Sequence, residues 1–171
     1  MVLRRAFALL NRLFPAGEAS AHCDIPCGIY DPHTAQLAAQ TVVRMLQLME
    51  GLAKPGPNAT KEEVDAYENS LGRYVTVKEQ HAELCKRELA ILWHDYFRPE
   101  HLEKYPDLHT TFWSTIKLAS RSKQTLDKQA AAGLLAGVQR IAETFWATKG
   151  AGVRKQPSLQ PVGGESVYPA P

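Results

Sequence analysis

The segment "LLAGVQRIAETF" (residues 134–145) shows the pattern from which the fold of this chain can be predicted. Its apolar positions recur at spacings of four, three and four residues: Leu134, Val138, Ile141 and Phe145. This spacing places them on one face of an α-helix, and such a face is stable only when it packs against other apolar surface. We therefore expect an amphipathic helix here that ends near Gly150.

Three earlier segments show the same periodicity. Their apolar positions are Ala38, Val42, Met45 and Met49 in the first, Val77, Leu84, Ile91 and Leu92 in the second, and Leu108, Phe112, Ile116 and Ala119 in the third. Four amphipathic helices joined by short connections predict an all-α fold, namely an antiparallel up-and-down four-helix bundle. We see no convincing strand pattern in the sequence.

The helix boundaries can be predicted from capping and breaking residues. Asp31-Pro32 marks the start of the first helix, and Pro106 marks the start of the third. Thr60 and Glu63 have the spacing of a capping box, so the second helix is expected to begin there and to run to about Phe97. Gly72 is a candidate break within that long helix.

The composition limits the classes of function. With 20 basic and 18 acidic residues, the net charge of +2 gives no reason to expect a nucleic-acid partner. No apolar run approaches the roughly 20 residues that a membrane-spanning helix needs. Three cysteines are too few for a disulfide scaffold. We therefore expect one folded domain over residues 22–149, followed by a disordered Gly- and Pro-containing tail over residues 150–171.

Residues 1–21 have the outline of a cleavable leader. Arg4 and Arg5 precede a short apolar stretch, Pro15 breaks it, and small residues (19–21) stand directly before His22. The alternative is an amphipathic helix that stays attached. We favour a cytoplasmic pro-segment over an export or organelle signal, because the cytoplasm would keep the thiols of Cys23 and Cys27, which follow directly, reduced.

The cysteines are concentrated in "HCDIPCGIYDP" (residues 22–32). The three residues between Cys23 and Cys27 exclude the C-x-x-C redox motif and the C-x-x-C-H haem motif. Pro26 and Gly28 favour a compact turn in which the two sulfur atoms can converge. The alternatives are a disulfide between the two cysteines or a pair of thiols without function.

Cleavage before His22 would complete a set of metal ligands. The new α-amine, the amide nitrogen of Cys23 and the two sulfur atoms can lie in one plane, a geometry that divalent nickel or copper favours. The imidazole of His22 then remains free to bind from above. Thiolate and amide donors also stabilise trivalent nickel, so the trimmed segment is a candidate one-electron centre.

This segment closely resembles the nickel hook of the nickel-containing superoxide dismutases, whose processed chains begin H-C-D-x-P-C-G-x-Y. Every fixed position of that motif is matched: His22, Cys23, Asp24, Pro26, Cys27, Gly28 and Tyr30. Further blocks that resemble the family are "VKEQHAEL" (77–84), "LWHDYFRPEHLEKYPDLH" (92–109) and "FWATK" (145–149). The resemblance therefore extends from His22 to about Lys149.

The resemblance implies a nickel-dependent enzyme that converts superoxide into dioxygen and hydrogen peroxide. It implies that His22 supplies an amine and the axial imidazole, that Cys23 supplies an amide nitrogen and a thiolate, and that Cys27 supplies the second thiolate. Tyr30 would act as a gate at the open nickel face, while Asp24, Pro26 and Gly28 shape the hook. The family also implies a processing protease, a homohexamer and, as a further partner, a nickel chaperone.

Two positions depart from the family pattern. In the family, a carboxylate on the first helix and an arginine on the second hold the axial imidazole, and these positions are Ala38 and His81 here. Groups that orient a metal-bound imidazole also tune the metal. His81 and Tyr96 are therefore candidates for contacting the metal ligands from outside. Two alternatives to an enzyme stay open: a non-catalytic nickel- or copper-binding helical protein, and a helical interaction module.

Overall fold

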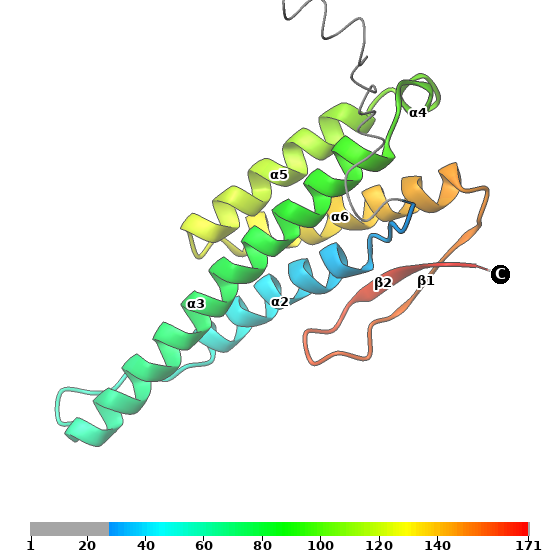
Figure 1. Ribbon diagram of the computed structural model, residues 1–171. Coiled ribbons are helices and arrows are strands. Elements are labelled where there is room, and N and C mark those ends of the chain that lie inside the picture. The colour runs from blue at the N-terminus through cyan, green and yellow to red at the C-terminus, as the bar shows by residue number, and fades with distance from the viewer. Residues whose placement is uncertain (1–27, 171) are drawn as a thin grey trace, which may run out of the picture.

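The computed structural model describes residues 28–170, and this part of the chain is mostly helical (Figure 1). The helices are α2 (His33–Glu50), α3 (Lys61–Ile91), η1 (Leu92–Tyr96, a π-helix), α4 (Pro99–Lys104), α5 (Leu108–Gln124) and α6 (Lys128–Thr148). The prediction of an all-α fold is confirmed only in its coarser form, because the described residues are mostly helical but also contain two short strands near the C-terminus. No helix in the described residues is long and apolar enough to cross a membrane.

The four long helices pack side by side around one apolar core. Helix α2 contacts α3 and α6, and α5 contacts the same two helices (Figure 1). All four apolar residues that define the predicted face of α6 are completely buried: Leu134, Val138, Ile141 and Phe145. They meet buried residues of the other helices, including Val42, Ala82, Leu89 and Phe112. The face predicted for α6 is therefore confirmed. On α3 the prediction is wrong in part, because Val77, Leu84 and Ile91 are only partly buried, and the buried positions are Lys78, Ala82, Cys85 and Leu89.

The start of α3 is capped as the sequence predicts. The Thr60 hydroxyl accepts a hydrogen bond from the Glu63 backbone N–H at 3.3 Å, and the Glu63 carboxylate accepts one from the Thr60 N–H at 2.9 Å. Gly72 does not break the helix, which continues to Ile91. Helix α5 begins at Leu108, shortly after Pro106, with Asp107 at its N-cap.

A buried lysine joins α3 to the end of α5. Lys78 is only 2% exposed, and its ammonium group donates to the carbonyl oxygens of Ser122 at 2.7 Å, Lys123 at 2.7 Å and Thr125 at 3.1 Å. The last carbonyl groups of a helix have no partner within the helix, so Lys78 satisfies groups that the chain would otherwise bury unpaired. Burial lowers the pKa of Lys78 below its ordinary value.

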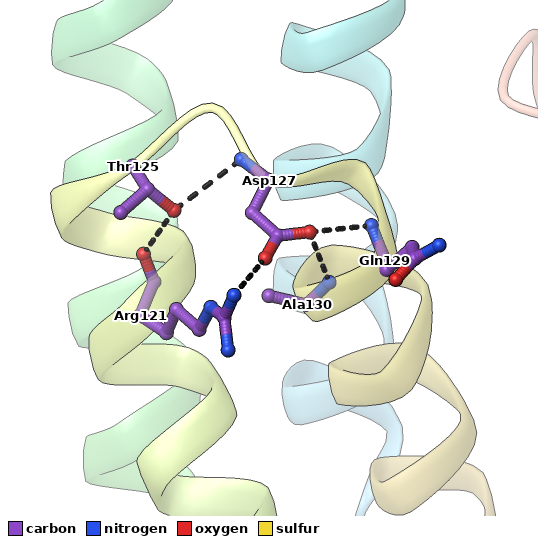
Figure 2. A network of polar contacts seen from close by, with 5 residues as sticks. All are labelled: Arg121, Thr125, Asp127, Gln129 and Ala130. Atoms are coloured by element: carbon purple, nitrogen blue, oxygen red, sulfur yellow. Dashed lines mark hydrogen bonds and ion pairs between the residues drawn. The ribbon is translucent and has the colours of Figure 1, made fainter.

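Asp127 caps the start of α6 (Figure 2). One carboxylate oxygen accepts hydrogen bonds from the N–H groups of Gln129 at 2.9 Å and Ala130 at 3.0 Å, and the other lies 2.6 Å from the Arg121 guanidinium. The backbone bond from Ala130, together with Arg121, lowers the pKa of Asp127. The short connection between α5 and α6 is therefore fixed by one ionised side chain.

The C-terminal segment forms a β-hairpin, which corrects the expectation of a disordered tail over residues 150–171. Strands β1 (Val153–Pro157) and β2 (Glu165–Pro169) pair antiparallel, with Lys155 opposite Val167. The hairpin contacts α2 and α6 (Figure 1). Ser166 and Val167 are buried there at 2% and 1% exposure, and this burial against the helices explains the ordered structure.

Candidate metal centre

The predicted nickel ligands His22, Cys23 and Cys27 lie outside the described residues, as do Asp24 and Pro26. Their proposed roles therefore stay predictions. Within residues 28–170, no group of three or more His, Cys, Asp or Glu side chains could hold a metal ion.

The segment that connects the predicted hook to α2 is described from Gly28 onward. Gly28 has a φ of +82°, in the left-handed region that favours glycine because a Cβ atom would clash with the backbone there. The Asp31 carboxylate then accepts a hydrogen bond from the His33 N–H at 2.7 Å. The chain therefore turns at Gly28 and enters α2 through an aspartate that binds the first helical residue.

The structure brings the candidate gate Tyr30 together with Tyr96. Their ring centroids are 5.6 Å apart, and the ring planes are tilted by 56°. Tyr30 is half-buried against the core, and Tyr96 is the last residue of η1. The contact therefore joins the entry to α2 with the end of the long α3–η1 segment.

Tyr96 is held firmly by its surroundings. Its ring lies 4.5 Å from that of Phe145 and is stacked on His101 at 5.7 Å. The Thr148 hydroxyl donates to the Phe145 carbonyl at 2.6 Å, so the Tyr96 hydroxyl, at 2.6 Å from Thr148 Oγ1, donates its own proton to Thr148. These contacts leave Tyr96 as a fixed surface on which Tyr30 rests.

A cation lies next to this aromatic group. The Lys149 ammonium is 5.3 Å from the centroid of the Tyr96 ring and 5.1 Å from that of Phe145, a distance at which a cation is attracted to a ring face. Lys149 is exposed. A positive charge at this place raises the local concentration of small anions.

Ala38 and His81, the two departures from the family pattern, line one cavity between α2 and α3. The cavity has a volume of about 420 Å³, and hairpin residues 160–162 form part of its wall. His81 Nδ1 lies 2.9 Å from the Val77 carbonyl, which can only accept, so Nδ1 carries the donated proton. The Ala38 side chain offers no polar group to this cavity.

Cys85 differs from the two cysteines of the predicted hook. It is completely buried in α3, and burial raises the pKa of its thiol to about 12. A thiol with this pKa remains protonated at neutral pH and is a poor metal ligand. Cys85 therefore acts as a small buried apolar residue.

Sequence reasoning missed three features around this region: η1, the position of Lys149 over Tyr96, and the row of α2 glutamines that contact the hairpin. A π-helix differs from an α-helix by its hydrogen-bond register, which apolar spacing does not reveal. The hairpin did carry a local signal. The turn-forming pair Gly163-Gly164 precedes a short segment that contains Val167 and Tyr168, two residue types that are frequent in strands.

Comparison with known proteins places the chain in a family. A sequence model described as "Nickel-containing superoxide dismutase" matches residues 17–149. The chain is 38% identical over 142 residues to the superoxide dismutase [Ni] of Streptomyces coelicolor, covering 82% of this chain and 98% of that protein. The corresponding protein of Streptomyces seoulensis has the same identity and coverage.

Solved structures agree with this assignment. A native nickel superoxide dismutase is 37% identical, with a TM-score of 0.63, and the match covers 76% of this chain and all of that one. A structure whose nickel ligation corresponds to the oxidised state is 35% identical, with a TM-score of 0.64 and the same coverage. The chain therefore belongs to the nickel-containing superoxide dismutases.

Proposed function

We propose that residues 1–21 are removed and that the processed chain binds nickel through His22, Cys23 and Cys27. At this centre, two superoxide ions and two protons become one dioxygen and one hydrogen peroxide molecule. The observation that carries this proposal is that all seven fixed residues of the hook motif are present in residues 22–30, within the matched region 17–149.

The chemistry of these residues suits nickel. The α-amine and imidazole of His22, the amide nitrogen and thiolate of Cys23 and the thiolate of Cys27 would hold the metal, because nitrogen and thiolate donors of this kind suit nickel. Nickel, when bound, supplies the one-electron chemistry by alternating between its divalent and trivalent states.

The described residues hold Tyr30 in position and supply the positive charge of Lys149. Tyr30 rests on Tyr96, which Thr148 and Phe145 hold in place. This arrangement fixes Tyr30, which the motif places next to the hook, so that Tyr30 can admit small molecules to the nickel site and exclude larger ones. Lys149, over the Tyr96 ring, attracts the superoxide anion toward this end of the molecule.

The proposal also covers the arrangement of the helices, the oligomeric state, the processing and the cellular compartment. The four long helices would form an antiparallel bundle that carries the hook at its N-terminal end, and the processed chains would assemble as homohexamers. A protease would expose His22, a nickel chaperone would assist loading, and the cytoplasm would keep the thiols reduced. These features rest on the resemblance of residues 22–149 to the family.

Electron paramagnetic resonance on the chain that begins at His22, loaded with nickel, tests the proposal. We expect a rhombic Ni(III) signal, split by the axial nitrogen and bleached by superoxide. Replacement of His22 by alanine keeps an α-amine but removes the imidazole, and it should abolish the nitrogen splitting. Intact-mass analysis of the isolated protein should show a chain that begins at His22.

A non-catalytic nickel-binding protein is the second candidate. The observation that favours it is that Ala38 and His81 stand where the family has a carboxylate and an arginine. In that case nickel would bind to the trimmed chain but give no Ni(III) signal, and superoxide would leave the sample unchanged. Such a result would replace the first function by the second.

A further inference from the structure

Helix α2 carries a row of glutamines that face the C-terminal hairpin. Gln36, Gln40 and Gln47 are separated by four and seven residues, so they lie on one side of the helix. Gln36 is 1% exposed and Gln40 is 3% exposed. A buried amide is costly unless it is hydrogen-bonded, so a buried row of this kind indicates a specific polar partner.

Gln36 makes two hydrogen bonds to the backbone of Val167. Its Nε2 donates to the Val167 carbonyl at 3.0 Å, and its Oε1 accepts from the Val167 N–H at 2.8 Å. In an antiparallel pair, only every second pair of facing residues exchanges backbone hydrogen bonds. The Ala170 N–H donates to the Gly152 carbonyl, so in this register Lys155 and Val167 form a pair without such bonds. The backbone N–H and carbonyl of Val167 therefore point away from β1. Gln36 therefore pairs with the free edge of β2 as a neighbouring strand would.

The other contacts extend along the helix. Gln40 Nε2 donates to Ser166 Oγ at 2.9 Å, and Gln47 Nε2 donates to the Val162 carbonyl at 3.2 Å. The hairpin also reaches the first residue of α2, because the His33 and Tyr168 rings are 5.6 Å apart. It is therefore attached to α2 from its first turn to near its last.

Helix α6 holds the same hairpin through more exposed contacts. Gln139 Nε2 donates to the Glu165 carbonyl at 2.7 Å, and the Glu143 carboxylate lies 2.6 Å from the Lys155 ammonium. Exposed pairs of this kind contribute little to stability. They therefore serve as a comparison for the buried contacts on α2.

The hairpin lies after the region that matches the family, residues 17–149. Its buried contacts with α2 begin in the first turns of that helix, which residues 28–32 join to the predicted hook in the sequence. We propose that Gln36 is a positioning residue: by binding β2 it fixes the first turns of α2 and thereby the nickel hook. This inference rests on the proposed function for the part that concerns nickel.

The test uses the processed full-length protein with Gln36→Met, which keeps the volume of the side chain but removes both hydrogen bonds. In the metal-free protein we expect hydrogen exchange at the Val167 amide and at residues 34–40 to rise about tenfold. In the nickel-loaded protein we expect transfer of nickel to a chelator to become about tenfold faster. Gln139→Ala, which removes a hairpin contact from α6, should leave these rates within about twofold.

Gln36→Asn provides a milder variant if Gln36→Met does not fold. It keeps a neutral amide but is one methylene shorter, so it reaches the two Val167 groups less well, and intermediate rates support the proposal. Faster exchange at Val167 with unchanged exchange in α2 would overturn it. Equal acceleration of nickel transfer by Gln139→Ala would also overturn it.

The two proposals fail in different ways. A wild-type protein that neither binds nickel nor reacts with superoxide would contradict the proposed function, whatever the hairpin does. Exchange in the metal-free protein reports on the link between Gln36 and α2 without any nickel. Wild-type nickel binding combined with unchanged nickel transfer in Gln36→Met would overturn the positioning role alone.

Discussion

The Tyr30 ring lies 5.6 Å from the Tyr96 ring, and Tyr96 is in turn bonded to Thr148 at the end of α6. Tyr30 therefore does not extend freely from the segment before α2. It rests on a residue that η1 presents and that α6 holds. Tyr30 and Thr148, which lie far apart in the sequence, are therefore connected through the side chain of Tyr96.

Replacing Tyr96 should therefore disturb the reaction through Tyr30. We expect Tyr96→Leu to lower kcat/KM for superoxide about two- to tenfold with unchanged nickel content, because an aromatic pair contributes about 0.5–1.5 kcal/mol beyond simple burial. Stopped-flow measurement of superoxide decay gives the rate, and metal analysis gives the nickel content. Tyr96→Phe keeps the ring and serves as the control. Equal rates for Tyr96→Leu and wild type would contradict the role of this contact.

Removing the charge of Lys149 should slow the arrival of the substrate. We expect Lys149→Ala to lower kcat/KM about two- to fivefold at low ionic strength, with the difference vanishing at about 0.5 M salt, because salt screens steering by an exposed charge. Lys117 also lies over an aromatic ring, that of Trp113 on α5, at 5.5 Å. Lys117→Ala is the matched control and should change the rate less. A loss that is independent of salt would exclude steering.

Lys78 should contribute strongly to stability. Lys78→Met keeps the apolar stem but leaves one buried and two partly buried carbonyl oxygens without their donor, and we expect the free energy of unfolding to fall by about 2–3 kcal/mol. Urea unfolding followed by circular dichroism measures this change. Lys117→Met alters an exposed lysine on α5 and should change stability by less than about 0.5 kcal/mol. Similar losses for the two variants would show that the buried bonds are unimportant.

Asp127 should make stability depend on pH in the acid range. The folded state lowers its pKa, so its contribution is present above the ordinary carboxyl pKa and is lost as the pH falls through the folded pKa. Asp127→Asn keeps an N-cap but neither ionises nor pairs with Arg121. We expect this variant to have a lower Tm than wild type at pH 7, with the difference shrinking below about pH 4. A difference that is constant down to pH 2.5 would contradict the ionic contribution.

The helices could be predicted because each signal was local. The apolar face of α6 and the capping box at Thr60 and Glu63 both depend on residues within a few positions of one another. The hairpin carried only a weaker local signal, the Gly163-Gly164 pair before β2. Strand β1 is mostly exposed, and β2 is held in place by Gln36, which lies 131 positions before its partner Val167 in the sequence. A glutamine on a helix gives no sign of such a partner.

The candidate site was predictable only in part for a similar reason. The hook motif is continuous in the sequence, so its donor atoms could be identified from residues 22–30 alone. The contact of Tyr30 with Tyr96 and the position of Lys149 arise from packing between separate helices. They require the relative placement of α2, η1 and α6, which no local pattern contains.

The pairing of Gln36 with Val167 also has a consequence for the order of events during synthesis. Translation delivers Gln36 before most of the helices have been made, and it delivers Val167 after the last of them. On the proposal above, the start of α2 gains its final contacts only when β2 has left the ribosome. Nickel loading of a well-positioned hook is then a step that follows translation, and a chain interrupted before Glu165 would release its metal readily.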